Sequence, residues 1–393
     1  MASTFVHMRP KVLFITRWYP NRVDKLDGNF IENHARAVFQ YCDLAVLHVC
    51  ADPAMSDKNF DWEMKEEFGF PVFRVWYRNN NVSKKGIGRV IKFFRYLKAT
   101  RIGWELVKKS FGLPDLNHVH IFTRPAMPAF YLQWRYGIPF IISEHSSHFV
   151  YDLPVLLPPL KWFAQFTAKN ARYVTAVSKT LQKAMLDFGF YGNYTIVPNV
   201  VFVSHDEMKN NDGNTINIVA IAGLSDVRKN IAGLIDVFTE AHHELTNANL
   251  HIIRPVPDVL LQQRGEESGL LNQKIYFHEN LGNDEVYALL RKSSFLVVNS
   301  LSETFSMAAA EALACGKPVI ATRCGGPEEF INEELGKLID VNDRQQLRDA
   351  LVWMSAHYRK FDPEKLKNFV EENFSSGVVG KKFLTLYQIV LNH

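Results

Sequence analysis

Long apolar runs are missing from this chain of 393 residues. No stretch of about 18 uncharged apolar residues occurs, so no membrane-spanning helix is expected. The first residues lack the sustained apolar core of a signal peptide. Cysteine is scarce, and the four cysteines form neither a C-x-x-C pair nor a zinc-binding spacing. We therefore expect reduced thiols and a cytoplasmic protein.

Motifs of several nucleotide-binding and metal-binding classes are also missing. The chain has no Walker P-loop, no internal repeat and no acidic D-x-D motif for a divalent metal. Gly86-Ile-Gly88 lacks the third glycine of a dinucleotide fingerprint and follows no strand-like run, so we interpret it as a loop. No metal ion and no other cofactor is expected.

What is present is a globular composition, with 47% hydrophobic and 22% charged residues. A chain of this length is too long for one ordinary core, so two domains are predicted. The formal net charge of +4 is small, so the local distribution of charge is more informative than its sum.

Apolar runs alternate with helical segments such as Phe30–Phe39, a pattern typical of parallel sheets. In the first half, strands are predicted at Lys11–Thr16, Leu44–Val49, His118–Phe122, Phe140–Ile142 and Tyr173–Val177. In the second half, they are predicted at Ile216–Ile221, Leu250–Ile253, Ile275–Phe277, Phe295–Val298 and Val319–Ala321. The predicted fold is α/β, with two doubly wound, Rossmann-like domains facing each other across a cleft.

A polar, turn-rich stretch separates the two halves, and we interpret residues 204–215 as the linker. The N-terminal domain then spans residues 1–203 and the C-terminal domain residues 216–376. A last helix is expected within residues 377–393.

Two glutamates bracket a strand-loop-helix junction in the second half. Glu303 follows the strand Phe295–Val298, and Glu311 lies in a helix that starts near Ser306 and stops at Gly316. Ligands of open α/β sheets bind at such junctions, where the helix N-terminus favours anions. Two glutamates eight residues apart are weak evidence alone, because a pair of solvated side chains explains them equally well.

The surrounding residues add to this evidence. The block from Glu303 to Ala321, followed by Gly325-Gly326-Pro-Glu-Glu, resembles the donor-site signature of the retaining glycosyltransferases of family 4, the glycosyl transferases group 1. The resemblance spans most of the C-terminal half. It implies the GT-B fold, with the N-terminal domain on the acceptor side, the C-terminal domain binding a nucleotide-sugar donor, and the last helix crossing back.

The resemblance also implies an activity. We expect a retaining, metal-independent glycosyltransferase of the hexosyltransferase type. It would move a sugar from a UDP- or GDP-linked donor to a saccharide or lipid-linked acceptor, as in polysaccharide or glycolipid biosynthesis. Two alternatives stay open: a nucleotide-sugar epimerase, and a non-catalytic nucleotide-sugar binding protein.

The resemblance assigns donor contacts in the C-terminal half. Glu303 would contact the sugar ring and Glu311 the ribose, because carboxylates accept two hydrogen bonds from a diol. Backbone N–H groups at the helix start would point to the sugar and phosphates, and they belong to Phe305, Ser306 and Met307. Lys229 matches a lysine that neutralises the diphosphate. The family's upstream arginine is absent, so Arg228 is expected to replace it.

Further positions match the family less closely. His145 matches a histidine that meets the sugar or acceptor, although a lone histidine is more often structural. Gly28 matches a glycine loop, although a simple turn explains it equally well. Asn199 lies in a Pro-Asn motif that lacks its usual aspartate. Arg254 and Val256 replace two glycines of the family, so we expect Arg254 to stack on the base or reach a phosphate.

The segment Lys84–Lys109 holds nine basic residues against one acid, with aromatic residues between them. One interpretation is a solvated helix whose aromatic side chains enter the core. The other is a helix on an anionic membrane surface, which would make the protein peripheral on the inner face of the membrane. No nucleic-acid-binding motif accompanies the charge, so nucleic acid is not an expected partner.

Overall fold

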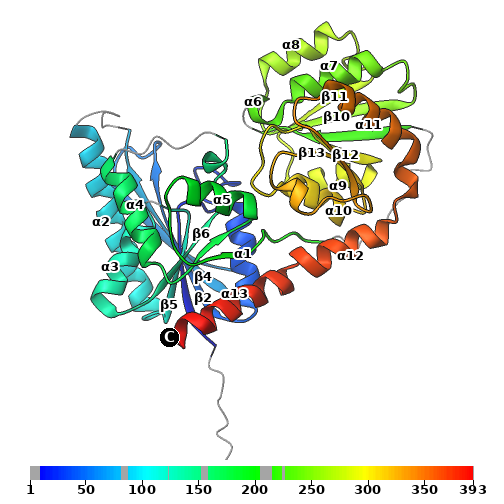
Figure 1. Ribbon diagram of the computed structural model, residues 1–393. Coiled ribbons are helices and arrows are strands. Elements are labelled where there is room, and N and C mark those ends of the chain that lie inside the picture. The colour runs from blue at the N-terminus through cyan, green and yellow to red at the C-terminus, as the bar shows by residue number, and fades with distance from the viewer. Residues whose placement is uncertain are drawn as a thin grey trace, which may run out of the picture.

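The computed structural model describes residues 9–80, 87–122, 124–151, 158–203, 215–223 and 226–392. They form two α/β units, each built on its own largely parallel sheet (Figure 1). The predicted linker, residues 204–215, lies outside the described residues except for residue 215.

The first unit contains an eight-stranded sheet in the order β3-β4-β2-β1-β5-β6-β7-β8. Its strands are β1 (Lys11–Thr16), β2 (Asp43–Asp52), β3 (Phe60–Glu67), β4 (Phe70–Arg78), β5 (Leu116–His120), β6 (Phe140–Glu144), β7 (Val174–Ala176) and β8 (Tyr194–Ile196). Its helices are α1 (Asn29–Phe39), α2 (Ile87–Ser110), α3 (Ala126–Tyr136), η1 (Ser147–Phe149), α4 (Pro158–Asn170) and α5 (Lys179–Asp187). All pairs are parallel except β3 with β4.

The second unit contains a six-stranded parallel sheet in the order β11-β10-β9-β12-β13-β14. Its strands are β9 (Ile216–Ile221), β10 (Ala248–Arg254), β11 (Ile275–Glu279), β12 (Phe295–Val298), β13 (Val319–Thr322) and β14 (Gly336–Ile339). Its helices are α6 (Asp226–Lys229), α7 (Ile231–Ala241), α8 (Val259–Glu267), α9 (Asn283–Lys292), α10 (Met307–Ala314), η2 (Pro327–Glu329), α11 (Arg344–His357), η3 (Tyr358–Lys360) and α12 (Pro363–Phe374).

The central strands are apolar because helices cover both faces of each sheet. Every residue of β5, β6 and β12 is buried. The order of each sheet reverses beside its first strand, β1 in one unit and β9 in the other. Ligands of doubly wound sheets bind at the carboxyl ends of strands near such a reversal. These two reversals, beside β1 and beside β9, therefore determine where the cleft lies.

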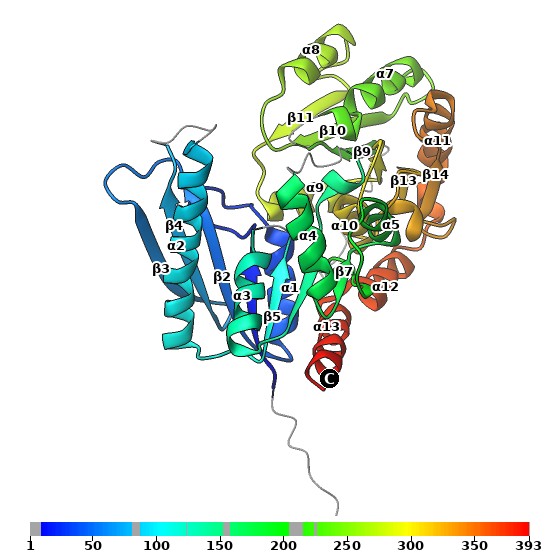
Figure 2. The same ribbon diagram turned by 60° about the vertical axis from the view of Figure 1, so that its left-hand side comes forward.

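The last helix, α13 (Ser376–Leu391), leaves the second unit and packs against α1 of the first (Figures 1 and 2). Gly380 permits the close approach, because a Cβ atom there would lie 2.4 Å from the carbonyl oxygen of Ala37. Farther along, the hydroxyl of Tyr387 lies 2.7 Å from Nδ1 of His118 on β5. Side chains of α13 thus complete the core of the first unit.

The sequence predicted most strands, including the edge strand β11, but missed β3, β4 and β14. β4 is a buried strand between β3 and β2, so not every missed strand lies at a sheet edge. β3 was missed because most of its side chains are exposed and many are charged, so it has no apolar run. β14 is only four residues long. The interpretation of Gly86-Ile-Gly88 as a loop is wrong for Gly88, which lies in the first turn of α2, whereas Gly86 is outside the described residues.

Within the described ranges, the helices do not combine the length and apolar character that crossing a membrane requires.

Candidate active site

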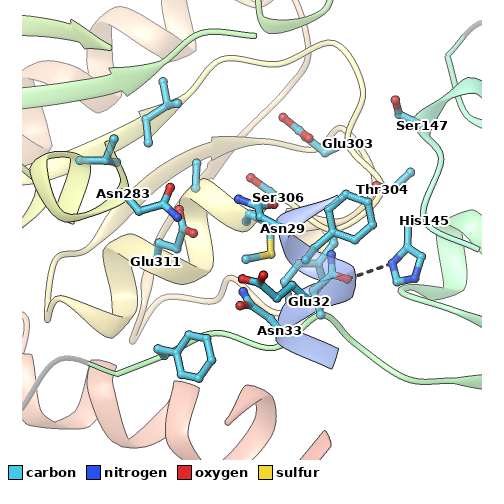
Figure 3. Close-up of a pocket in the computed structure, with 18 of the residues that line it drawn as sticks. Asn29, Glu32, Asn33, His145, Ser147, Asn283, Glu303, Thr304, Ser306 and Glu311 are labelled. Carbon is cyan, nitrogen blue, oxygen red and sulfur yellow. Dashed lines mark hydrogen bonds between the residues drawn. The ribbon is translucent and has the colours of Figure 1, made fainter. Parts of the chain in front are cut away.

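A cavity of about 750 Å³ lies between the two units. The second unit contributes residues of α6, α9 and the Glu303–Ala308 segment, and the first contributes residues of α1 and the loop after β6. Figure 3 shows Glu303 and Glu311 across the cavity from Glu32 and Asn33 of α1. Nine residues predicted as site residues line it: His145, Asn199, Arg228, Lys229, Glu303, Phe305, Ser306, Met307 and Glu311.

Glu303 and Lys229 form an ion pair on the second unit's wall. Oε1 of Glu303 lies 2.6 Å from Nζ of Lys229 and accepts a hydrogen bond from Ser300 at 2.7 Å. Glu303 is buried, and the Lys229 side chain is 16% exposed. A buried carboxylate needs a partner of opposite charge, and Lys229 is that partner for Glu303.

The backbone around Glu303 is fixed by the two glycines that follow β13. Its N–H donates to the carbonyl of Cys324 and its carbonyl accepts from Gly326, at 2.8 and 2.9 Å. A Cβ atom on Gly326 would lie 2.5 Å from Cα of Phe305, so only glycine allows this approach. The paired glycines of the sequence motif therefore hold the Glu303 loop against β13.

Helix α10 points its N-terminus into the cavity. Ser306 is in the left-handed conformation with φ 70°, and it turns the chain sharply into the helix. Phe305, Ser306 and Met307 line the cavity, and the hydroxyl of Ser306 has no hydrogen-bond partner among the described residues. The unpaired N–H groups at a helix start attract anions, so this end of α10 suits phosphate oxygens.

Glu311 lies one turn into α10, beside Tyr287 of α9. Burial raises the pKa of Glu311 to about 7, although the Lys229 charge and a hydrogen bond with Tyr287 both oppose the rise. Near neutral pH the carboxyl group is thus divided between its charged and neutral forms. The ionised form can accept two hydrogen bonds from a diol.

Arg228 connects the two units directly. It follows β9 in the short helix α6, and its guanidinium donates to the hydroxyl of Ser147 in the first unit. Its backbone carbonyl accepts from the N–H of Leu301, at 2.8 Å, in the loop that leads to Glu303. Arg228 and Lys229 therefore place two cations at the boundary between the walls.

His145 lies on the first unit's wall, just after β6, and is 8% exposed. Its Nδ1 is 3.1 Å from Oδ1 of Asn199, and its Nε2 is 3.4 Å from Nδ1 of His120. Burial lowers the pKa of His145 well below its ordinary value, and the neighbouring His34 lowers it further. His145 is therefore a neutral ring whose orientation is set by Asn199 and His120.

Three buried histidines, His34, His120 and His145, bring ring nitrogens within 4.8 Å of one another. Neutral imidazoles are ligands for transition metals rather than for the magnesium that accompanies many nucleotide diphosphates. The chemistry of this histidine group therefore does not fit magnesium.

Two predicted site residues do not line the cavity. Gly28 has φ +66°, and a Cβ atom there would lie 2.5 Å from the carbonyl carbon of Trp18; its neighbour Asn29 reaches the cavity instead. Arg254 is buried in the second unit. It forms an ion pair with Glu279 and lies 4.0 Å over the ring of Phe277. Its contacts thus hold the end of β10 in place.

Sequence reasoning missed the polar residues that α1 and α9 add to the cavity. They are Asn29, Glu32, Asn33 and Arg36 on α1, and Asn283, Asp284, Tyr287 and Arg291 on α9. The helical spacing of those on α1 was visible in the sequence, because positions three, four and seven apart share one helix face. Nothing in the sequence showed that this face borders a cavity.

Comparisons with known proteins identify the family of this chain and its fold. The model of Glycosyltransferase Family 4 matches residues 60–204, and that of Glycosyl transferases group 1 matches residues 215–357. Together they cover most of both units. The chain belongs to the group 1, family 4 glycosyltransferases. It has the GT-B fold of two facing Rossmann-like units.

Two relatives illustrate the similarity in sequence. An uncharacterised glycosyltransferase of Methanocaldococcus jannaschii is 28% identical over 73% of this chain and 74% of its own length. The putative teichuronic acid biosynthesis glycosyltransferase TuaC of Bacillus subtilis is 23% identical over 97% of this chain and 98% of its own length.

Two solved structures illustrate the similarity in fold. Sucrose-phosphate synthase of Thermosynechococcus elongatus superposes with a TM-score of 0.75 at 18% identity, covering 98% of this chain and all of that one. Anabaena HepE in complex with UDP-glucose superposes with a TM-score of 0.69 at 15% identity, covering 97% of this chain and all of that one. At these identities the likeness concerns the fold alone.

The ion pair of Lys229 gives a first prediction. Lys229→Ala should lower donor turnover about a hundredfold, because one charge contact in a closed site is lost. Arg228→Ala should add to the loss in the double variant. The measurement is the rate of donor turnover, with Lys365→Ala as control, since Lys365 is exposed on α12. Turnover at the wild-type rate in both single variants would contradict the role of this loop.

The pKa of Glu311 gives a second prediction. A raised pKa favours the protonated folded state, so this group's contribution to stability is lost as pH rises through about 7. Donor affinity should change in the opposite direction and increase from pH 6 to 8 if the ionised carboxylate accepts hydrogen bonds from the ribose hydroxyls. Titration calorimetry with UDP-glucose and GDP-mannose measures the affinity at each pH, because the diphosphate of neither donor changes its protonation between pH 6 and 8. Glu311→Gln should weaken binding and flatten the profile; an unchanged affinity would exclude the ribose contact.

Proposed function

We propose that this glycosyltransferase is a retaining, metal-independent hexosyltransferase with a UDP- or GDP-linked sugar donor and a glycan or lipid-linked acceptor. The observation that carries the proposal is the Lys229–Glu303 ion pair, which lies in one cavity with Glu311 and the start of α10. A cation, a helix N-terminus and two carboxylates are the groups that a diphosphate, a sugar ring and a ribose require.

The proposed donor occupies the second unit's wall. Its diphosphate would lie between Lys229, Arg228 and the N–H groups that begin α10, and these positive groups would stabilise the leaving diphosphate. The ribose diol would bond to Glu311. As the diphosphate attracts Lys229, Glu303 becomes available to accept hydrogen bonds from the sugar. No step in this scheme requires a metal ion at the phosphates, which is the basis for proposing metal-independence.

The proposed acceptor occupies the first unit's wall, beside His145 and the polar face of α1. His145 is neutral, and both ring nitrogens already face protein groups, so it would pack against the sugar and orient it. Retention requires the acceptor to attack on the face from which the diphosphate leaves. Both walls border one cavity, an arrangement that allows the acceptor hydroxyl and leaving oxygen to approach together.

The names of similar proteins support the donor and acceptor classes. TuaC is named for teichuronic acid biosynthesis, which agrees with a role of this enzyme in polysaccharide synthesis. HepE was solved with UDP-glucose, which agrees with a nucleotide-sugar donor.

We also propose a peripheral contact with the inner face of an anionic membrane through Lys84–Lys109. Helix α2 leaves five apolar side chains exposed: Ile87, Val90, Ile91, Phe93 and Phe94. Its other two aromatic residues, Tyr96 and Trp104, are buried, so the aromatic side chains of α2 divide between the core and the surface. Exposed apolar residues among cations are typical of helices that lie in a membrane interface. Lys84 and Lys85 lie outside the described residues.

A third prediction tests the reaction itself. Incubated with a UDP- or GDP-hexose and a saccharide acceptor, the enzyme should form a glycoside with the anomeric configuration of the donor. Activity should survive EDTA, because cationic side chains would replace the metal. NMR of the first-formed product determines the configuration, and an inverted linkage would exclude retention. Isomerisation of the donor without transfer would indicate an epimerase, and binding without turnover a non-catalytic protein.

A fourth prediction tests the membrane contact. The enzyme should co-sediment with anionic vesicles at low salt, and binding should fall at high salt, because each Lys or Arg near the surface contributes roughly 1 kcal/mol. Replacing Lys84, Lys85, Arg89, Lys92 and Arg95 with Gln should abolish it and leave donor binding intact. The charge-matched control replaces the exposed Arg323, Arg359, Lys360, Lys365 and Lys381 with Gln. If the wild-type protein does not bind anionic vesicles, the membrane contact is excluded and α2 is a solvated helix.

A further inference from the structure

Arg36 is a cation of the cavity to which the proposed transfer reaction gives no role. It lies on α1, whose residues Asn29, Glu32, Asn33 and Arg36 all line the cavity. The spacing of three, four and seven residues places them on one face of the helix. Arg36 is two turns from the helix start, on the wall opposite Lys229 and Glu303.

Two aromatic rings hold the Arg36 guanidinium. Its central carbon lies 4.6 Å from the ring centre of Phe68 and 4.6 Å from that of Phe202. Phe68 comes from the turn between β3 and β4, and Phe202 from the segment after β8. Rings near a guanidinium restrict its orientation but leave its N–H donors unused, because the rings offer only their faces.

The side chain is half-buried, and it makes no hydrogen bond or ion pair with any residue that the structure describes. The buried Arg74 of the first unit, in contrast, is paired and donates two hydrogen bonds of 2.8 Å to Glu67. A guanidinium that has lost part of its hydration is stabilised by an anion, and its planar donors match a carboxylate or phosphate.

Glu32 is the acidic group nearest to Arg36 on the same helix face. Burial raises the pKa of Glu32, Glu67 raises it further, and the charges of Arg36 and Arg74 oppose the rise. The two side chains therefore influence each other without forming an ion pair. Glu67 itself is bound to Arg74, so it is not available to Arg36.

We propose that Arg36 binds an anionic group, a carboxylate or a phosphate, on the acceptor. The inference rests on the proposed function, which places the acceptor on the first unit's wall. The donor diphosphate has its own cations, Lys229 and Arg228, on the other wall. Arg36 thus selects an acidic or phosphorylated saccharide over a neutral one, while the amides of Asn29 and Asn33 are free to meet hydroxyl groups.

The test compares three probes that share one sugar ring: glucose, glucuronate and glucose 6-phosphate. Their affinities are measured by ligand-observed NMR titration on the full chain, with and without UDP. One anionic probe should bind at least about tenfold more tightly than glucose, which is about 1.4 kcal/mol. The probe with the larger preference identifies the anion as carboxylate or phosphate. Arg36→Met should reduce the preference to near unity, and Arg36→Lys should keep part of it.

The control variant is Arg135→Met, because Arg135 is an exposed arginine of α3 that also lies over a ring, that of Tyr136, but outside the cavity. It should keep the full preference. A wild-type protein without the preference, or an Arg36→Met variant that retains it, would overturn the proposal. So would an equal loss of UDP affinity in Arg36→Met, because that places Arg36 on the donor. A separate titration with UDP and with GDP tests the proposed function. If neither nucleotide binds, that function fails while the probe ratio still decides the role of Arg36.

Discussion

The ion pair of Lys229 and Glu303 is the interaction around which the cleft is organised. The two residues follow neighbouring strands, β9 and β12, and their 2.6 Å contact neutralises both charges beside the start of α10. A donor diphosphate would compete with Glu303 for Lys229. In the proposed site, Lys229 is therefore held in place before the donor binds and can exchange Glu303 for the diphosphate. The flanking structure serves this arrangement, since Gly326 lets the Glu303 loop approach β13 and Arg228 attaches to both Leu301 and Ser147.

A site shared by two units requires that the units keep the same relative position, and hydrogen bonds between described residues of the two units contribute to this. Helix α13 inserts Tyr387 against His118. Glu329 of the second unit accepts from the backbone N–H groups of Lys179 and Thr180, at 2.9 and 2.7 Å, and so caps α5 of the first. A carboxylate at a helix start is favourable for the same reason that a phosphate is.

The sequence predicts a feature of this structure best when the residues that determine it lie close together along the chain. Glu303 and Glu311 could be placed because an apolar strand, a loop and a helix surround them within 30 residues. The contact of His145 with Asn199 joins residues 54 apart, and the Arg36 cluster joins rings from two distant segments, so neither was visible locally. Arg254 replaces a glycine of the family, and in the structure it pairs with Glu279 on β11 and does not line the cavity.

The most direct measurement is a crystal structure of the enzyme with the nucleotide sugar that most raises its melting temperature. The account predicts the diphosphate within hydrogen-bond distance of Lys229, a sugar hydroxyl on Glu303 and the ribose diol on Glu311, with the Lys229–Glu303 contact lengthened. A nucleotide sugar bound outside this cavity, or a diphosphate held elsewhere while Lys229 stays paired with Glu303, would contradict it.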